Sequence, residues 1–588
     1  MAATGAEASA AMNGDHDHVL RPRPRKPVNP QLAELTRQAS NVSVTSSNGY
    51  LTMPENGTVS GLTSSCLQII VAARRPFPKT PPSPPKPSRT RASKVRAEQR
   101  RRLFPTIDYT ARVSHFDPES DYRDFHGFFN LFWIGLAIMA ITSMLRNIKD
   151  TGSPLRVQIW TLFTVKLWHL AIADFLMVAT TAISLPLARL SRKTQGGMGW
   201  DQGAMAVQSV YQVAWLAFWV FVPFALHWTW TAQVFFLLHT MVLLMKMHSY
   251  AFYNGHLSET EKRLRALDDP MTTASKAPAY VYPTVENPMG EFAHKSKVAP
   301  SENGENGENG NDSDGGSHSD AEIERLAQLR ADLARELTSP IGNITYPRNL
   351  TWPNYADYLL CPTLCYELEY PRNDHINWIP LVSKIVATFG CIFLLTIISE
   401  EFILPVLQES HQGLIDTHNN KSMLDTMLIL AETISWLLFP FMLTFLLVFL
   451  VIFEYVLGAF AEITRFADRH FYADWWNSTD WMEFSREWNV PVYSFLRRHV
   501  YATSKQRIGR PMATLITFLV SALGHEIVMA CITKKIRGYG FICQMLQLPI
   551  VMLQRTRWVR GKKTLNNVCF WCSMVLGLSL ICSLYVLV

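Results

Sequence analysis

The chain has 588 residues and a formal net charge of +7, and 48% of its residues are hydrophobic while 18% are charged. The charged fraction is below the roughly 25% that is usual for soluble domains. Nine scattered cysteines exclude a disulfide scaffold, and the pair Cys569 and Cys572 lacks the second pair of a metal site. We therefore expect no metal site, and the modest charge gives no reason to expect a nucleic-acid partner.

Residues 1–124 are polar and rich in Pro, Ser and Arg. A segment of this composition cannot bury a core, so we predict a disordered, basic, cytoplasmic tail. The first hundred residues also lack the apolar core of a secretory signal peptide. Membrane insertion is therefore expected to depend on the internal helices.

Nine apolar windows follow the tail, most of them close to the roughly 20 residues that span a bilayer. They lie near 125–144, 167–189, 206–226, 230–247, 378–398, 425–456, 512–533, 540–554 and 567–588. These windows predict an all-α, polytopic membrane protein with four spans in residues 125–250 and about five in residues 345–588. His169 and Asp174 lie in the second window, where an ionisable residue is either functional or a packing partner.

A polar insert separates the two groups of spans and covers residues 251–344. Its low-complexity stretch ENGENGEN predicts flexibility. One amphipathic helix is expected near its end, because apolar residues recur there at helical spacing. They are Ile323, Leu326, Leu329, Leu333 and Leu337. Ser319 and Glu322 have the spacing of a capping box, and Pro340 ends the pattern.

The loop charges predict an orientation, because cytoplasmic loops carry an excess of Lys and Arg. The stretch 464–511 contains Arg465, Arg469, Arg486, Arg497, Arg498, Lys505, Arg507 and Arg510. In contrast, the stretch 399–424 has Lys421 as its only basic residue beside four acids. With nine spans, a cytoplasmic N-terminus fits both stretches. The loop 534–539 violates the rule, since it carries Lys534, Lys535 and Arg537 on the far side.

His525 and Glu526 lie near the middle of the window 512–533, and Ser521 precedes His525 by one helical turn. A neutral imidazole can take a proton from an alcohol as a general base. A lone histidine in a membrane is also often a hydrogen bonder between helices, so this pattern alone leaves both roles open. For Glu526 the sequence leaves two roles open, an acid that orients a neighbour and a buried structural acid.

An aromatic segment before this helix gives a second signal. Residues 471–477 read FYADWWN and comprise Phe471, Tyr472, Ala473, Asp474, Trp475, Trp476 and Asn477. An interfacial aromatic belt would explain the Trp and Tyr residues but does not require Asp474 and Asn477. Asn489 follows as an amide donor for a developing oxyanion. The basic residues between Arg497 and Arg510 suit a phosphate-bearing ligand, and they equally suit the orientation signal.

Three features together resemble the membrane-bound O-acyltransferases: FYADWWN, the pair Trp488-Asn489 and the intramembrane pair His525-Glu526. The resemblance is to the branch that contains sterol and diacylglycerol O-acyltransferases. Further stretches look most similar to fungal-type sterol O-acyltransferases. They are MKMHSY (245–250), PTLCYELEYPR (362–372), GAFAEITRFADRHFYADWWN (458–477) and FLRRHVY (495–501). The resemblance covers roughly residues 125–250 and 345–588.

The resemblance implies a bundle of about nine membrane helices with an internal tunnel, in which residues 345–588 form the catalytic core. It implies acyl-CoA as co-substrate without a further cofactor, a sterol or other lipid alcohol as acceptor, the endoplasmic reticulum membrane, and a homodimer or higher oligomer. It assigns catalysis to His525 with support from Asn489 and Glu526. It assigns acyl-CoA binding to Phe471, Tyr472, Asp474, Trp475, Trp476, Asn477, Tyr501, Arg510 and Ser521.

Two alternatives stay open at this point. One is diacylglycerol as the acceptor, because both lipids present a hydroxyl group to the same catalytic residues. The other is a transporter without chemistry, in which Asp174, His525 and Glu526 line a polar path. The sequence also departs from the family at Tyr493, where many members have a histidine, and the effect of this change is not readable from the sequence.

Overall fold

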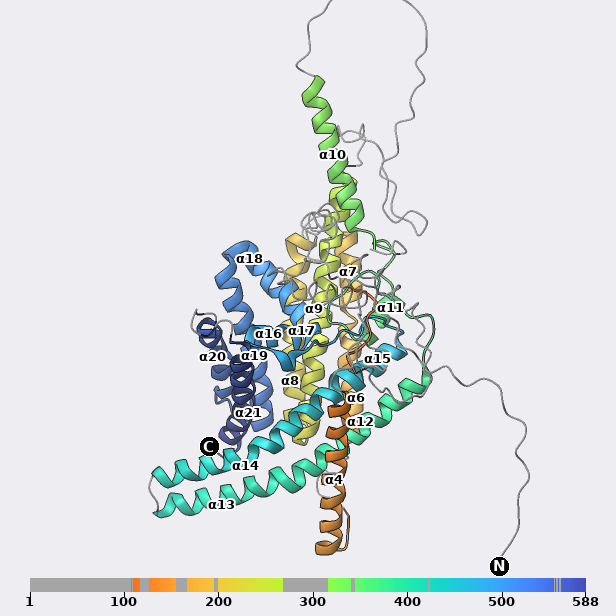
Figure 1. Ribbon diagram of the computed structural model, residues 1–588. Coiled ribbons are helices and arrows are strands. Elements are labelled where there is room, and N and C mark those ends of the chain that lie inside the picture. Colours follow the sequence, from red (N-terminus) through yellow and green to blue (C-terminus); the bar gives the residue numbers. More distant parts are fainter. Residues whose placement is uncertain are drawn as a thin grey trace, which may run out of the picture. The chain divides into compact units, whose positions relative to one another are not determined.

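The computed structural model describes residues 107, 109–116, 126–154, 166–194, 199–267, 316–339, 344–420, 423–554, 556, 559 and 562–587. Within these ranges the regular structure is helical, and only isolated bridges, without a named strand, join extended segments (Figure 1). The predicted all-α class is therefore confirmed. The low-complexity stretch of the insert and the chain before residue 107 lie outside the described residues.

Among its described residues, the N-terminal half contains six helical elements. They are α4 (His126–Thr151), α6 (Leu167–Thr181), α7 (Ser184–Lys193), the π-helix η1 (Trp200–Ala204), α8 (Met205–Ala225) and α9 (Trp230–Leu267). α9 is much longer than the window 230–247, because buried Tyr253, Leu257 and Leu264 continue its apolar face. The prediction that residues 251–267 belong to a flexible insert was therefore wrong.

The amphipathic helix of the insert is α10 (Gly316–Glu336), and it packs against α9. Leu333 and Leu337 are buried as predicted, but Leu329 is 46% exposed, which corrects the predicted apolar face. Small buried residues form the rest of that face: Ala327, Ala331 and Ala334. They permit a close approach of the two helices. The side chains of Ser319, Glu322 and Ile323 lie outside the described ones.

Two long helical rods come next, after the short α11 (Trp352–Leu360). The first consists of α12 (Trp378–Ile398), η3 (Ser399–Ile403) and α13 (Leu404–Asn420). The second consists of α14 (Met423–Phe449), η4 (Leu450–Val456) and α15 (Leu457–Ile463). Their apolar segments have 38 and 41 residues, about twice the length that a bilayer requires. The acidic stretch 399–424 therefore lies largely within helices.

The C-terminal part begins with short helices and ends with three long ones. They are η5 (Trp475–Asn477), α16 (Trp481–Glu487), α17 (Val490–Phe495), η6 (Leu496–Tyr501), α18 (Ala502–Ile508), α19 (Arg510–Thr533), α20 (Tyr539–Gln554) and α21 (Lys563–Leu587). Among the described residues, eight helices are long and apolar enough to span a membrane, and α20 is a shorter apolar helix. The estimate of about nine spans agrees with this count.

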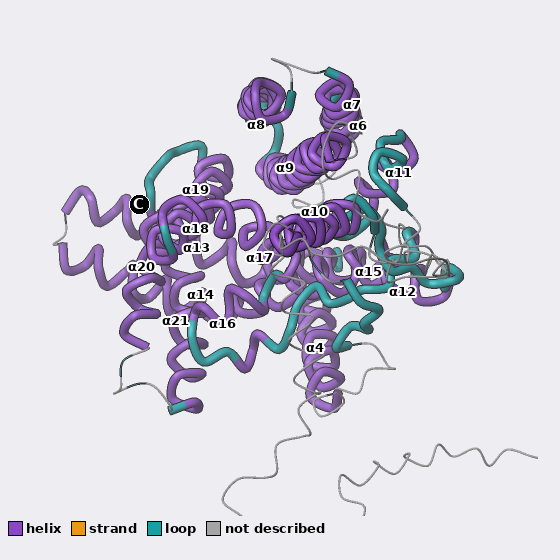
Figure 2. Tube along the Cα trace, turned by 90° about the horizontal axis from the view of Figure 1, so that it is seen from above, coloured by secondary structure: helices purple, strands orange, loops and turns teal. Residues whose placement is uncertain are grey.

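Figure 2 shows α19, the helix that contains His525, beside two groups of helices. α6, α8 and α9 pack on one another in one group, while α14, α20 and α21 belong to a second group. α19 contacts α9 of the first group and α20 of the second. The helix that carries His525 therefore lies between the two groups.

Part of the predicted disordered tail is instead ordered. Within residues 109–116, Arg112 forms an ion pair with Asp468 at 2.7 Å, and Ser114 is buried. The backbone N–H of Arg112 also donates to the carbonyl of Ala467. The prediction of a disordered tail through residue 124 was therefore wrong for residues 109–116, which pack on the segment before FYADWWN.

Candidate active site

His525 is an exposed residue of α19, with a single hydrogen bond among the described contacts. Its Nδ1 lies 2.8 Å from the backbone carbonyl oxygen of Ser521. Because a carbonyl oxygen can only accept, Nδ1 must carry the proton of this bond. The lone pair of the neutral ring is then on Nε2, which is the protonation state that a general base requires.

Ser521 contributes to this geometry through its backbone and not through its hydroxyl group. The bond to His525 uses a carbonyl group that any residue at position 521 would supply. The side chain of Ser521 is half-buried on the same helix. Its predicted contact with the thioester of acyl-CoA therefore stays a prediction.

Glu526 follows His525 in sequence but has a different environment. It is buried, and its carboxylate accepts hydrogen bonds from the N–H groups of Gly538 (2.7 Å) and Phe541 (3.0 Å) and from the Tyr585 hydroxyl (2.8 Å). Gly538 and Phe541 lie at the start of α20, where the N–H groups have no partner within the helix. Glu526 thus joins α19, α20 and α21, and no described hydrogen bond links it to His525. This geometry favours the role of a structural acid for Glu526. The predicted support of His525 by Glu526 has no described hydrogen bond between the two side chains.

Arg537 has a structural role in the loop 534–539, the basic loop that violates the loop-charge rule. Its Nη1 donates to the carbonyl oxygens of Leu584 (3.0 Å) and Tyr585 (2.9 Å). These carbonyls belong to the last turn of α21, where a basic side chain is favourable. The violation of the loop-charge rule at 534–539 thus includes a residue with a structural task.

Asn489 is the N-cap residue of α17. Its Oδ1 accepts the N–H of Val492 at 3.1 Å, which fixes the orientation of the amide group. The amide nitrogen Nδ2 consequently points away from the cap and keeps its two N–H donors for another acceptor. No described hydrogen bond joins Asn489 to His525. Tyr493, at the position of the unusual substitution, is a half-buried residue of the same short helix.

The aromatic segment 471–477 is largely part of the protein core. Phe471, Tyr472 and Trp475 are 3%, 1% and 1% exposed. The ring of Trp475 lies 4.9 Å from that of Trp488, in an edge-to-face arrangement. Asp474 and Trp476 are half-buried, and Asn477 is exposed. The three buried rings pack against protein and expose almost no surface to a ligand. Their predicted contact with acyl-CoA therefore stays a prediction.

A partly buried ion pair next to this segment was not predicted from the sequence. Lys384 of α12 lies 2.9 Å from Glu454 of η4, and Glu454 also accepts hydrogen bonds from Tyr472 and Ser114. The signals in the sequence are Lys384, the only Lys, Arg, Asp or Glu of the window 378–398, and Glu454, one of three acids in the window 425–456. The pair connects α12 and η4 to FYADWWN and to the ordered segment 109–116.

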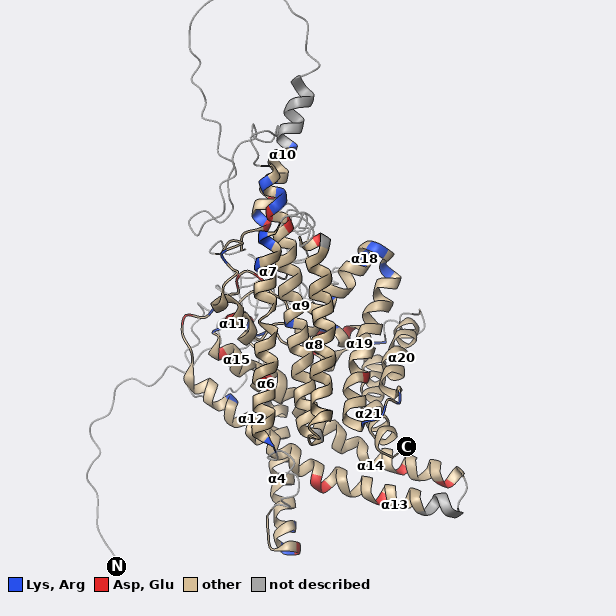
Figure 3. Ribbon diagram, turned by 180° about the vertical axis from the view of Figure 1, so that it is seen from behind, with Lys and Arg blue, Asp and Glu red and all other residues tan. Residues whose placement is uncertain are grey.

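The basic cluster divides into exposed and buried members. Arg497, Lys505, Arg507 and Arg510 are exposed, and those of α18 and the start of α19 form a basic tip (Figure 3). Arg498 is buried and forms an ion pair with Glu367 at 3.0 Å. The expectation that Arg498 faces a phosphate-bearing ligand was therefore wrong, because its charge is used inside the protein.

Two further residues assigned to acyl-CoA lie in elements next to the His525 helix. Tyr501 ends η6 and is half-buried, and Arg510 begins α19. η6, α18 and α19 pack on one another. The fold thus brings the elements of Tyr501, Arg510 and His525 together, whereas no described hydrogen bond or ion pair joins the three side chains.

The intramembrane residues of the first group have an ordinary structural explanation. Asp174 of α6 lies 2.6 Å from Nδ1 of His239 in α9, so the packing alternative is favoured for it. His169 is exposed on α6. A polar path through Asp174, His525 and Glu526 gains no support, because Asp174 and Glu526 each bond to a neighbouring helix.

Comparison with known proteins places the chain among enzymes. A sequence model of the membrane-bound O-acyltransferase family matches residues 204–587. A probable sterol O-acyltransferase 2 of Schizosaccharomyces pombe is 36% identical over 464 residues, which cover 79% of this chain and 87% of that protein. The probable sterol O-acyltransferase 1 of the same organism is 32% identical over 504 residues, with 82% and 87% covered. Diacylglycerol O-acyltransferase 1 of Dictyostelium discoideum is 34% identical over 265 residues, with 45% and 41% covered.

Proposed function

Because the chain belongs to the membrane-bound O-acyltransferase family, we propose that it transfers a fatty acyl group from acyl-CoA to the 3-hydroxyl of a sterol. The product is a steryl ester, a storage form of the sterol. The similarity to sterol O-acyltransferases extends over about four fifths of the chain, whereas the diacylglycerol O-acyltransferase matches less than half of it. This difference in coverage supports the sterol as the acceptor.

The observation that supports the chemistry is the proton on Nδ1 of His525, which leaves the lone pair on Nε2. In the proposed reaction Nε2 takes the proton of the sterol hydroxyl while its oxygen attacks the thioester carbonyl. The new C–O bond forms, the C–S bond breaks, and the proton passes from His525 to the departing thiolate. The products are the ester and free CoA.

Asn489 is proposed to stabilise the negative charge that develops on the thioester oxygen. Its cap bond engages Oδ1 and therefore leaves the Nδ2–H groups as donors. No covalent acyl-enzyme is required, because alcohol and thioester can react directly when both are held in one tunnel. Acyl-CoA is then the co-substrate, and the chemistry described here uses no other cofactor.

The binding of acyl-CoA is proposed to use the exposed basic residues Arg497, Lys505, Arg507 and Arg510. Guanidinium and ammonium groups bind phosphate well, and the CoA moiety carries phosphate groups. Of the aromatic segment, Trp476 and Asn477 retain surface for a ligand. The buried Phe471, Tyr472 and Trp475 are proposed to act as a rigid wall behind them.

We infer the orientation from the distribution of charged residues in Figure 3. Lys and Arg gather at α18, and Asp and Glu lie along α13. We place the α18 end and the N-terminus in the cytoplasm, from which acyl-CoA enters. The endoplasmic reticulum membrane and a homodimer or higher oligomer follow from the family resemblance. Cysteine labelling from each side of sealed microsomes tests the orientation, and light scattering with size-exclusion chromatography tests the assembly.

The decisive experiment supplies labelled acyl-CoA and either acceptor to membranes of cells that lack both sterol and diacylglycerol acylation. The chain should form steryl ester, and His525→Ala should remove this activity. His169→Ala is the matched control, because it removes another exposed histidine of a membrane helix.

Three outcomes would change the proposal. Formation of triacylglycerol without steryl ester would move the acceptor to diacylglycerol. Retention of more than about a tenth of the activity in purified His525→Ala would exclude its role as general base. Absence of any acyl-CoA-dependent ester formation would favour a transporter.

A further inference from the structure

Residues 361–370 form a buried segment without regular secondary structure. Every residue from 361 to 368 is buried, although the segment contains no helix or strand. Irregular segments usually lie on the surface, because buried N–H and C=O groups need partners that a loop does not supply. A buried segment of this kind therefore requires dedicated partners.

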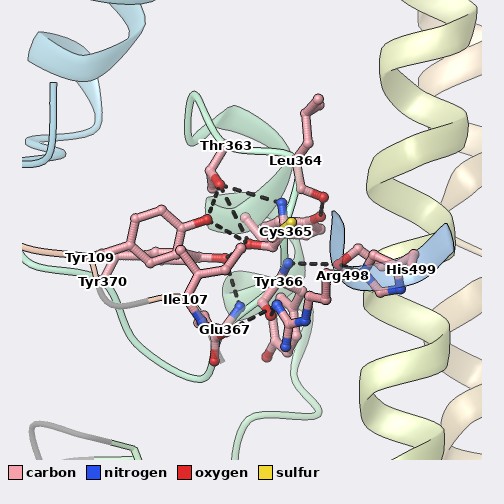
Figure 4. A network of polar contacts seen from close by, with 12 residues as sticks. Ile107, Tyr109, Thr363, Leu364, Cys365, Tyr366, Glu367, Tyr370, Arg498 and His499 are labelled. Atoms are coloured by element: carbon pink, nitrogen blue, oxygen red, sulfur yellow. Dashed lines mark hydrogen bonds and ion pairs between the residues drawn. The ribbon is translucent and has the colours of Figure 1, made fainter. Parts of the chain in front are cut away.

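Side chains supply these partners, as Figure 4 shows. The N–H of Tyr366 donates to Oγ of Ser249 at 2.9 Å, and the N–H of Glu367 donates to the Tyr370 hydroxyl at 2.9 Å. The Tyr370 hydroxyl donates in turn to the carbonyl of Cys365. The sequence PTLCYELEYPR, which has no role in the proposed reaction, thus supplies one partner through Tyr370, and Ser249 of α9 supplies another.

Arg498 of η6 contacts this segment from the other side (Figure 4). Its Nη1 donates to Glu367 and to the carbonyl of Tyr366, both at 3.0 Å, and its guanidinium lies 4.7 Å from the ring of Tyr253. The side chains of Arg498 and Glu367 are 2% and 4% exposed. Removal of either partner of a pair buried to this degree leaves the other charge unpaired in the interior, which is strongly destabilising.

His499, the next residue, binds α9. Its Nε2 lies 2.9 Å from the same Ser249 hydroxyl that accepts the N–H of Tyr366. Burial, together with the nearby charge of Arg498, lowers the pKa of His499 well below 6.5. The neutral imidazole can therefore accept a hydrogen bond from the Ser249 hydroxyl. This bond completes a closed circuit of contacts through Tyr366, Arg498, His499 and Ser249.

The π-helical geometry of η6 permits two adjacent residues to face inward. A π-turn is one residue wider than an α-turn, and such turns are frequent at functional sites. In η6, Arg498 is buried and His499 half-buried, whereas the preceding Arg497 is exposed. η6 packs directly on α18 and α19, so its position determines where Arg497, Tyr501 and the start of α19 lie.

We propose that Glu367, Arg498, His499 and Ser249 form a clamp that positions η6 for acyl-CoA binding. The clamp residues are positioning residues, because none of them is placed in contact with a substrate. Their effect passes through η6 to Arg497 and Tyr501, which meet the CoA end of the donor. This proposal rests on the proposed function and assigns the segment 362–372 to donor binding, not to the choice of sterol.

The test compares the binding of a non-reactive thioether analogue of acyl-CoA with the KM values for acyl-CoA and sterol, in purified protein. Glu367→Gln should weaken analogue binding and raise the KM for acyl-CoA by at least about tenfold. The KM for sterol should change less than twofold. Ser249→Ala is a milder variant that keeps the ion pair. It should weaken analogue binding and raise the KM for acyl-CoA about threefold.

Asp468→Asn is the control, because it breaks another carboxylate–arginine pair, between the buried Asp468 and the exposed Arg112, that has no described bond to η6. It should reduce stability without changing analogue binding. His499→Gln retains an acceptor for Ser249 and should bind the analogue better than His499→Leu.

Unchanged analogue binding in folded Ser249→Ala and Glu367→Gln would overturn the clamp and leave a packing role. Equal increases of both KM values would also contradict it. His525→Ala distinguishes this failure from failure of the proposed function, because it should bind the analogue normally while it forms no ester. If the wild type acylates diacylglycerol instead, the same KM comparison is made with that acceptor.

Discussion

The exposed face of α19 and the buried segment 471–477 differ in how firmly the rest of the protein holds their side chains. His525 is exposed and has one hydrogen bond, to a backbone carbonyl. Tyr472 is almost fully buried and bonds to Glu454 and Ser114. A group that reacts must stay accessible, whereas a group that shapes a site is fixed by its neighbours. We therefore expect mutations on the first region to change rate and mutations in the second to change stability.

The largest effect on stability is expected at the ion pair next to the aromatic segment. Glu454→Gln leaves the partly buried charge of Lys384 without its partner, which should cost about 3 kcal/mol, the lower end of the range for a broken buried pair. Thermal unfolding in detergent measures this loss. The double variant Lys384→Met/Glu454→Met should recover most of it, because no charge is then buried. If the single and double variants are equally destabilised, the pair is not the source of the stability.

Asn489 is expected to affect both the reaction rate and the stability of the protein. Asn489→Asp keeps an oxygen for the N–H of Val492, so the cap of α17 and the melting temperature should be preserved. It removes the Nδ2–H donors, and kcat should fall about 10²–10³-fold, as for a lost oxyanion donor. Asn489→Ala should lose the cap as well, at about 1 kcal/mol. A fully active Asn489→Asp would exclude the proposed role of Nδ2.

Glu526 sharpens the comparison, because it is adjacent to His525 and belongs to the buried kind of residue. Glu526→Gln replaces a carboxylate that accepts three hydrogen bonds, and the expected loss of stability is about 1–3 kcal/mol. The kcat of the folded fraction should stay within about threefold of wild type. A loss of kcat at unchanged stability would instead return Glu526 to the role of orienting His525.

The smallest effect is a dependence of stability on pH through His499. The pKa of His499 in the folded protein lies below 6.5, so the unfolded chain binds a proton that the folded protein does not. Stability should therefore fall as the pH drops below about 6.5 and should be fully present above it. Melting temperatures between pH 5.5 and 7.5 should show a shallower acid decrease in His499→Gln than in wild type. Parallel curves would remove His499 as a contributor.

The predicted positions of the helices were good where a bilayer alone decides the length of an apolar run. All nine windows correspond to helices of the structure. The extension of α9 to Leu267 was missed, because its polar residues resemble a hydrophilic insert in sequence, although the fold buries several of them, among them Asn254, Ser258 and Thr260. The helical stretch 399–420 was missed because its acidic residues are typical of a loop between two spans.

The sequence proposed residues for the candidate site but not the contacts that they make. His525 and Asn489 were proposed from chemistry and family resemblance. The partners of Glu526 and Arg498 were not, because Tyr585 and Glu367 lie far away in the sequence and only the fold brings them close. Periodicity identifies the face of a helix, but it carries no information about which distant residue packs on that face.

The central claim is that the exposed Nε2 of His525 is the base and that its buried neighbour is not. Its most direct test measures single-turnover ester formation and thermal unfolding for purified His525→Ala and Glu526→Gln side by side. The predicted result is a loss of about 10²–10⁴-fold in rate at an unchanged melting temperature for His525→Ala, and the reverse pattern for Glu526→Gln. A His525→Ala protein that loses stability but keeps the rate of its folded fraction would contradict the account.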